Sequence, residues 1–355
     1  MKLRALRAAL VRSTFPESAG LADVITRMGF IQADPIRAPA RAQDLILRHR
    51  VTDYRAGDLE RHYPELDLDE DFVYAYGFVP ARTRALLHPR GGEKPRGLAR
   101  EILEFVARTG PTHPTDLVQH FGQRRASNAW GAQSRASTRV LHRLHYQGHL
   151  RIARRDGGVR VYEAANPVGD PLTPAERLDR LVILVADIFG PLPLSSLRGV
   201  MNHLKYAVPT ARARHLAIPR LLAAGQLESG VVDGVSYVWS PAHAPLRDVE
   251  APRLVRFLAP FDPLVWDRRR FEQLWEWSYR FEAYTPLAKR KLGYYALPLL
   301  WVDRVIGWTN VSVKSGRLTA ELGYVKGRPR GREFTVALEA ELARVRRFLA
   351  LPALE

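Results

Sequence analysis

The heptapeptide Gly29–Pro35 brings together two side chains that can act on a water molecule. Gln32 and Asp34 are two residues apart in a short run that is predicted to be extended, so both side chains point to one face. Pro35 disfavours a helical conformation at Asp34 and keeps that residue extended. The carboxylate can accept a proton from water and stabilise a nearby positive charge, while the amide can donate and accept hydrogen bonds. The alternative is a polar strand end that faces solvent.

Helices are predicted on both sides of this heptapeptide. A helical pattern over Leu21–Met28 stops at Gly29, a residue suited to the left-handed position just past a helix end. Further helices are predicted over Leu3–Val11 and Ala40–Arg50. Beyond them, four aromatic residues alternate with other residues, which predicts one strand face or a packed loop: Phe72, Tyr74, Tyr76 and Phe78.

The middle of the chain repeats an outline. Each repeat reads helix, Gly-Pro turn, two helices and a hairpin around an Asp-Gly turn, which is typical of a winged helix-turn-helix. The predicted fold class is α+β, with tandem winged helix-turn-helix motifs and a small β-barrel-like α+β domain at the C-terminus. The predicted domains are a winged-helix-like N-terminal domain with the Gln-x-Asp motif at 1–95, winged helices at 96–168 and 169–248, and a β-rich domain at 249–355.

Composition narrows the classes of protein that the chain can be. The 355 residues carry a formal net charge of +17, which suits a polyanionic partner, with nucleic acid ahead of a membrane surface. The absence of cysteine excludes disulfides, cysteine-bound metals and thiol nucleophiles. No segment approaches the about 20 continuous apolar residues of a transmembrane helix. The histidines are scattered and no phosphate loop or dinucleotide glycine pattern occurs. We therefore expect no metal, no cofactor, no membrane contact and a cytoplasmic, nucleoid-associated protein.

Basic residues cluster at two predicted surface features. The first hairpin carries Arg151, Arg154 and Arg155, which we expect to contact DNA, although such a cluster can also be a solvated face. The second hairpin has acidic residues and no basic residue, so it is expected to pack against a neighbouring part of the chain. Near the C-terminus, Arg328 and Arg330 belong to a basic loop that is either a phosphate site or a solvated loop.

A family resemblance rests on several long motifs. The stretches Phe261–Arg270, Tyr279–Arg290 and Gly293–Pro298 closely resemble the YcaQ (AlkX)/AlkZ family of winged-helix DNA glycosylases, which act on alkylated and interstrand-crosslinked DNA. The block from Gln32 to Tyr54 is similar to the same family. The resemblance covers most of the chain and is weakest between Gly91 and Glu250.

The resemblance implies roles for particular residues. Gln32 and Asp34 match the family's catalytic pair, in the aspartate form typical of the crosslink-unhooking branch. It also implies DNA-binding residues, namely Arg41, Arg268, Arg269, Arg270, Lys289 and Arg290, and residues that support the active site, namely Tyr74, Asp262 and Trp266. Two departures from the family pattern stand out, Phe72-Val73-Tyr74 in place of Trp-x-His and Gly307-Trp308-Thr309-Asn310 in place of Gly-Arg-x-Asp. The first changes a supporting residue of the site, and the second changes a DNA contact or local packing.

The activity implied by the resemblance is hydrolysis of an N-glycosidic bond. Gln32 would position the water, and Asp34 would activate it and stabilise the oxocarbenium ion formed by an N7-alkylguanine or a crosslinked base in double-stranded DNA. No lysine lies near the motif in the sequence, so we expect simple hydrolysis to an abasic site. We expect the protein to act as a monomer. An open basic cleft around the duplex is expected, because a crosslinked base cannot be fully swung into a snug pocket. The alternative is a non-catalytic winged-helix DNA-binding protein, either a transcription regulator or a damage sensor.

Overall fold

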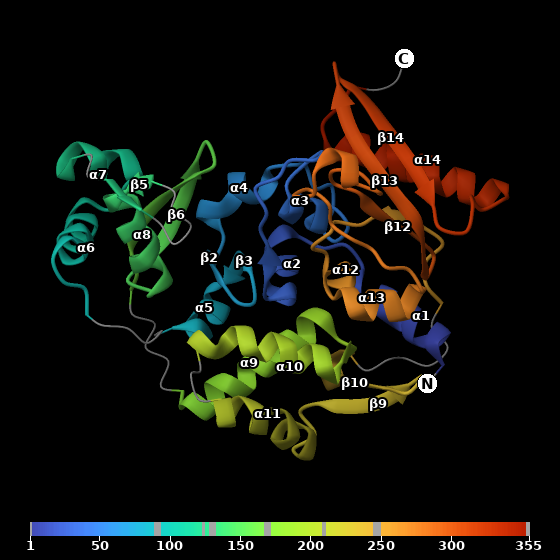
Figure 1. Cartoon of the computed structure of the whole chain (residues 1–355), viewed down its shortest axis with the longest axis horizontal. Helices are drawn as coiled ribbons and strands as arrows, with labels where there is room; N and C mark the ends of the chain where they lie inside the picture. The colour runs from blue at the N-terminus through green and yellow to red at the C-terminus, as the bar shows by residue number, and fades with distance from the viewer. Residues whose placement is uncertain are drawn as a thin grey trace.

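The elements of the chain form four groups. The computed structural model describes residues 2–88, 94–122, 125–127, 133–166, 172–207, 211–243 and 250–352. The N-terminal elements, blue in Figure 1, lie between the other three groups. Residues 98–164 form the lobe on the left of the view, residues 174–239 lie below, and residues 255–348 form the sheet and helices on the right.

The N-terminal segment packs short helices around a three-stranded antiparallel sheet of order β1-β3-β2. Its elements are α1 (Leu3–Thr14), α2 (Leu21–Met28), β1 (Ile31–Gln32), α3 (Ala42–Leu47), α4 (Asp58–His62), η1 (Tyr63–Glu65), β2 (Leu68–Phe72), β3 (Tyr76–Pro80) and α5 (Ala81–Leu87). The predicted helices are confirmed as α1, α2 and a shorter α3. Of the alternating aromatic residues, Phe72 ends β2, Tyr74 lies in the turn of the β2–β3 hairpin, and Tyr76 and Phe78 belong to β3.

Both repeats predicted for the middle of the chain have the expected helices and hairpin. The first contains α6 (Leu98–Thr109), α7 (Pro114–Phe121), β4 (Arg125–Ser127), β5 (Gln133–Arg135), α8 (Ala136–Tyr146), β6 (Leu150–Asp156) and β7 (Val159–Ala164). The second contains α9 (Pro174–Phe189), β8 (Leu192–Pro193), α10 (Leu194–His203), η2 (Leu204–Tyr206), α11 (Ala211–Ala223), β9 (Glu228–Val232), β10 (Val235–Trp239) and η3 (Pro241–His243). The first hairpin turns at Gly157 and Gly158, one residue later than predicted, because Asp156 is still paired with Val159.

The C-terminal segment is built on an open four-stranded antiparallel sheet of order β11-β12-β13-β14. Its elements are β11 (Val255–Phe257), α12 (Pro263–Trp266), α13 (Arg268–Trp275), η4 (Leu287–Lys289), β12 (Leu297–Trp301), β13 (Arg304–Lys314), β14 (Arg317–Tyr324) and α14 (Arg332–Phe348). The mixed α+β class is confirmed, but the barrel-like prediction is wrong for the described residues. A barrel requires every strand to have two neighbours, and β11 and β14 each have one.

The second hairpin packs inward, as its lack of basic residues predicted. Val232 and Tyr237 lie in a buried cluster with Leu10 of α1 and Phe271 of α13. The Tyr237 hydroxyl donates a hydrogen bond to Gln273 Oε1 at 2.7 Å. This hairpin is therefore part of the joint between the lower group of elements and the C-terminal segment.

No helix within the described ranges has the length and apolar character needed to cross a bilayer.

Three consecutive acidic residues of β2, namely Asp69, Glu70 and Asp71, are almost completely buried. Charged side chains are rarely buried unless they are paired. Asp69 accepts from Arg84 at 2.9 Å and from Arg151 at 3.3 Å. Burial raises the pKa of Asp69 to about 6, against the effect of these two arginines.

The neighbouring carboxylate, Glu70, joins the N-terminal sheet to the first hairpin. Its two oxygens accept from Nε and Nη2 of Arg155, each at 2.6 Å, and Tyr76 donates a further hydrogen bond at 2.7 Å. Burial is the largest influence and would raise the pKa of Glu70, but the hydrogen bonds and charge of Arg155, with Tyr76 and Arg160, together lower that pKa. The Nε2 of His88 lies 2.6 Å from Asp71 Oδ2. The pairs of Arg151 with Asp69 and of Arg155 with Glu70 fix the orientation of the first hairpin relative to β2.

Removing the Glu70 carboxylate should destabilise the protein strongly. In Glu70→Ala, Arg155 stays largely buried without its counter-ion, and breaking such a pair costs about 3–5 kcal/mol. We expect this loss in the free energy of unfolding measured with urea. The matched control is Glu163→Ala, whose pair with Arg151 is partly exposed and is expected to contribute less than about 1 kcal/mol. Equal losses in the two variants would contradict the role assigned to Glu70.

Candidate functional site

The Gln-x-Asp motif lies where α2 ends and β1 begins. Gly29 adopts the predicted left-handed conformation, with φ of 67°, and closes α2. In β1, Ile31 pairs with Phe78 and Gln32 pairs with Gly77. A Cβ at Gly77 would lie 2.3 Å from the Ile31 carbonyl oxygen, so only glycine permits this close approach of β3. The strand that carries the motif is thus fixed by backbone pairing at the edge of the N-terminal sheet.

Asp34 is held in a nearly closed environment just beyond β1. Its side chain is 9% exposed. Its Oδ1 accepts a hydrogen bond from the Ile36 amide at 2.9 Å, and its own amide donates to Gln43 Oε1 of α3 at 3.4 Å. Among the described residues, the structure shows no hydrogen-bond partner for Oδ2. The carboxylate therefore keeps one oxygen available for a bound molecule.

Two further polar atoms of this region are buried without a partner among the described residues. They are Oε1 of Gln32 and the hydroxyl of Tyr295. Tyr295 precedes β12 and its ring packs edge-on against Phe281, with centroids 5.2 Å apart. Leaving a buried polar atom unsatisfied costs about 1–3 kcal/mol, so such atoms usually meet water or a ligand. Their hydrogen-bonding capacity, with that of Asp34, can hold a water molecule.

The electrostatics of the site follow from its burial. Burial raises the pKa of Asp34, and the Ile36 amide opposes that shift only in part. Burial also raises the pKa of Tyr295, and the negative charge of Asp34 raises it further, which places the two side chains within electrostatic reach. At neutral pH the site consequently combines a carboxylate of increased basicity with a protonated phenol.

Positively charged side chains lie within and beside residues 33–41. Arg37 is exposed, and Arg41, at the start of α3, forms an ion pair with Glu60 of α4. A Cβ at Gly158, in the turn of the first hairpin, would lie 2.8 Å from Arg41 Nη2. The pKa of Arg41 is lowered first by burial and then by the charges of Arg37 and Arg155. The arginines of two separate segments therefore meet beside the motif.

The three residues expected to support the site form a joint between the N-terminal, α9 and C-terminal elements. The Tyr74 ring lies 4.6 Å from Trp266 and 4.7 Å from Phe30, which precedes the motif. Asp262 is fully buried and accepts from both terminal nitrogens of Arg50, at 2.9 and 3.1 Å. No hydrogen bond from these three side chains to Gln32 or Asp34 is present in the described structure. Their support acts through packing against neighbouring elements.

The arginines of the first hairpin are mostly engaged inside the protein. Arg151 and Arg155 bind the buried acids of β2, as described above. Arg154 is exposed and pairs with Asp156 on the same strand, at 2.9 and 3.0 Å. Its surface position leaves Arg154 as the first-hairpin residue best placed among the three for contact with a polyanion.

The predicted basic residues of the C-terminal segment also divide by burial. Arg270 is 1% exposed and donates to the carbonyls of Phe189 and Pro191, so it cannot reach DNA in this conformation. Arg268 is partly buried and donates to the Pro260 and Val265 carbonyls at 2.9 and 2.7 Å. The remaining predicted residues are exposed or partly exposed: Arg269, Lys289, Arg290, Arg328 and Arg330.

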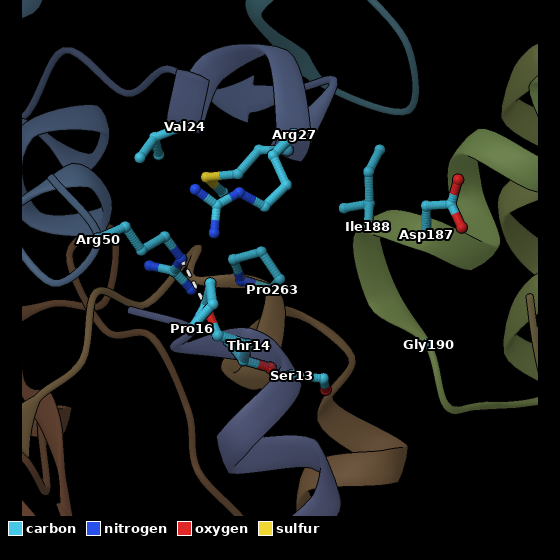
Figure 2. A pocket seen from close by; sticks show the side chains of 11 residues that line it. Ser13, Thr14, Pro16, Val24, Arg27, Arg50, Asp187, Ile188, Gly190 and Pro263 are labelled. Carbon is cyan, nitrogen blue, oxygen red and sulfur yellow. Dashed lines mark hydrogen bonds between the residues drawn. The ribbon is translucent and has the colours of Figure 1, made fainter. Parts of the chain in front are cut away.

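A small pocket, partly open to solvent, lies elsewhere, between α1, α2, α9 and α12. In Figure 2, Arg27 and Arg50 approach it from the N-terminal elements, and Asp187 lies on α9. Arg50 already donates to the Thr14 and Ile46 carbonyls, at 3.1 and 2.7 Å, as well as to the Asp262 carboxylate. Neither residue of the Gln-x-Asp motif lines this pocket. This pocket is therefore separate from the motif.

Sequence reasoning did not single out Tyr295, Gln43 or Arg37. Tyr295 lies within the family-like stretch Gly293–Pro298, which was the available signal, but nothing in the sequence relates it to a residue as distant as Asp34. Gln43 and Arg37 are close to the motif in sequence, and only the fold around α3 gives them their positions. The described residues contain no group of three histidine or acidic side chains that could hold a metal ion.

The fold and the site can now be compared with known proteins. The family model described as DNA glycosylase AlkZ-like matches residues 25–348. The chain therefore belongs to the AlkZ-like DNA glycosylase family, as its motifs predicted. A solved structure, the DNA glycosylase AlkZ of Streptomyces sahachiroi, matches 100% of this chain and 99% of its own with a TM-score of 0.66 and 15% sequence identity. At that identity the structural match shows a shared fold.

Asp34 should reduce stability at neutral pH. Its raised pKa means that the folded protein binds this proton more tightly than the unfolded chain, so the stabilisation exists at acid pH and is lost as the pH rises through the folded-state pKa. We expect Asp34→Asn to raise the melting temperature at pH 7, with a difference that shrinks as the pH falls. Asp23→Asn, at an exposed carboxylate of α2, should bring no such gain. A lower melting temperature for Asp34→Asn at pH 7 would contradict this electrostatic description.

Proposed function

We propose that the protein is a monofunctional DNA glycosylase that removes N7-alkylated guanine, including guanine in an interstrand crosslink, and leaves an abasic site. The observation that supports this most directly is the nine-tenths buried Asp34 with a free oxygen, in the same motif as the unpartnered Gln32 Oε1. A folded protein keeps unmet polar groups at a cost in stability, and functional sites are where that cost is commonly accepted.

The mechanism begins with cleavage of the bond between C1′ of the sugar and N9 of the base. Both electrons pass to the base, where they neutralise the positive charge that alkylation placed on the imidazole ring. A general acid is therefore dispensable. Asp34 stabilises the positive charge that develops on the sugar, an effect that is stronger in a site with little water. The oxygen of a water held by Gln32 then bonds to C1′, and its proton passes to Asp34.

The raised pKa of Asp34 suits this role. A carboxylate whose pKa is raised by burial accepts a proton more readily than an ordinary aspartate. The Tyr295 hydroxyl can donate a hydrogen bond to Asp34 or to the water, which would fix the position of both. No lysine lies near the motif in the sequence, so the proposed reaction is hydrolysis without a Schiff base.

The proposed architecture is three winged-helix units followed by a β-rich domain, at 1–95, 96–168, 169–248 and 249–355. In its support, the sheet orders β1-β3-β2 and β8-β10-β9 are equivalent, and a bridge from Thr112 to Tyr162 adds a third strand position beside the β6–β7 hairpin. Exposed basic residues around these units would contact phosphates of double-stranded DNA. We propose a monomer without a metal or cofactor, acting at the nucleoid in the cytoplasm.

The second candidate is a relative that senses damaged DNA without cleaving it. It is favoured by Tyr74, which occupies a position where many family members have histidine and which packs among aromatic rings. A transcription regulator is the remaining alternative. Both would bind DNA without forming abasic sites, and the regulator would be indifferent to lesions.

Base removal from defined duplexes tests the proposal. Purified protein is incubated with duplex DNA that carries one N7-alkylguanine, or separately one N7–N7 guanine crosslink, and abasic sites are converted to strand breaks with mild alkali. We expect lesion-dependent breaks whose rate falls by about 10²–10⁴-fold in Asp34→Asn, with DNA affinity unchanged. Asp23→Asn is the matched surface control.

Three outcomes would contradict the proposal. Equal rates for Asp34→Asn and the unaltered protein would remove Asp34 from the reaction. Breaks without alkali would indicate lyase chemistry in place of simple hydrolysis. Tight lesion binding without any breaks would identify the damage sensor.

A further inference from the structure

The loop of residues 282–293, called here the Glu282 loop, exposes two large apolar side chains. Tyr284 is 80% exposed and Leu287 is 79% exposed, more than any other exposed large apolar side chain in the described part of the chain. Tyr294, directly after the loop, is 44% exposed. Apolar side chains gathered on a surface often mark a site of interaction. The activity proposed above assigns no task to Tyr284 or Leu287.

The Glu282 loop is rigidly built. Glu282 is 6% exposed, and its Oε2 accepts hydrogen bonds from the amides of Lys291, Leu292 and Gly293 at 2.8, 2.8 and 3.3 Å. A single carboxylate thereby ties the end of the loop to its beginning. Arg290 Nε donates to the Thr285 carbonyl at 2.7 Å and braces the tip.

A neighbouring strand also holds the loop. Asn310 of β13 donates to the Leu292 carbonyl at 2.7 Å. Asn310 belongs to the second departure from the family pattern, and in this structure its side chain serves local packing. Because the backbone is fixed in this way, Tyr284 and Leu287 are presented in place before any partner binds. A preorganised surface loses little entropy on binding.

Rings connect the tip of the loop to the candidate site. Tyr284 lies 6.2 Å from Phe281, centroid to centroid, and Phe281 lies 5.2 Å from Tyr295. Tyr295 is the buried phenol whose pKa is raised in part by the charge of Asp34. The exposed tip is therefore connected through Phe281, by two ring contacts, to Tyr295 of the candidate site.

The charge around the tip identifies the class of partner. The exposed cations Arg280, Lys289 and Lys291 and the partly exposed Arg290 flank the two apolar side chains in the sequence, and the one acidic residue of the loop, Glu282, is buried and bound to backbone amides. A nucleic-acid duplex offers both kinds of contact, because its apolar base stack lies between two rows of phosphates. An anionic lipid surface would also meet an apolar tip flanked by cations, and the membership of the chain in a DNA glycosylase family favours the duplex.

We propose that Tyr284 and Leu287 form a wedge that enters the base stack of double-stranded DNA beside the lesion, while Lys289 and Arg290 contact the flanking phosphates. This inference rests on the proposed function and adds the means by which the duplex is opened. Displacing a base from the stack costs a few kcal/mol, and an inserted ring or aliphatic side chain restores part of the lost contact. A wedge also suits a crosslinked base, which can be tilted out of the stack without leaving the duplex.

Fluorescence of 2-aminopurine next to the lesion tests the wedge directly. The probe brightens when its stacking is lost. Binding is measured in the Asp34→Asn background, so that no base is removed during the experiment. We expect a strong increase in fluorescence on binding, which is lost when Tyr284→Ala and Leu287→Ala are combined and retained in Tyr284→Phe. Val336→Ala, at a 54% exposed apolar residue of α14, is the matched control and should keep the full signal.

Excision with Asp34 intact supplies a second measurement. Loss of stacking on one base is worth about 5- to 150-fold, so the double variant should excise more slowly by that factor at saturating enzyme. Both side chains are exposed, and the melting temperature should stay unchanged. An unaltered fluorescence increase in the double variant would overturn the wedge, and so would an equal loss in Val336→Ala. A loss of self-association on light scattering, with the fluorescence increase intact, would instead assign the tip to contact between copies of the chain.

The two proposals fail in different ways. Absence of abasic sites with every lesion would overturn the glycosylase, and the fluorescence of bound duplex would still report on the wedge because it requires no cleavage. Normal excision by the double variant would overturn the wedge and leave the glycosylase intact.

Discussion

The burial of three consecutive carboxylates in β2 is the constraint around which the N-terminal half of the protein is arranged. Asp69 and Glu70 are paired with arginines of α5 and the first hairpin, and Asp71 lies against His88, which directly follows α5. Strand β2 pairs with β3, and β3 in turn pairs with β1, the strand that carries Gln32. The β2–β3 hairpin therefore contacts the first repeat through β2 and positions the candidate site through β3.

The candidate site uses the opposite strategy, because its polar groups are buried without full compensation. Asp34 has a single hydrogen bond to its side chain, and Gln32 Oε1 has none among the described residues. The buried charges of β2 are paired, and the pairs hold them in fixed positions. The motif instead keeps unpaired polar groups available for water and substrate. This contrast is expected of a protein that tolerates local destabilisation only where chemistry requires it.

The large positive charge of the chain is likewise divided between structure and surface. Arg151, Arg155 and Arg270 stabilise interior contacts and contribute little to an external field. Exposed cations that remain include Arg37, those of the Glu282 loop and those before α14. A count of arginines indicates a polyanionic partner, whereas the distribution of their ion pairs determines which of them can meet it.

The sequence by itself determined the local elements, the two repeats, the family and the conformation of the Gln-x-Asp motif. These depend on glycine, proline and apolar spacing within a few residues, which act wherever the chain is placed. Only the tertiary structure decided that Arg155 serves Glu70, that Tyr295 lies near Asp34, and that the C-terminal sheet stays open. Burial and ion pairing join residues far apart in the chain, so their outcome depends on how whole elements pack and cannot be derived from spacing.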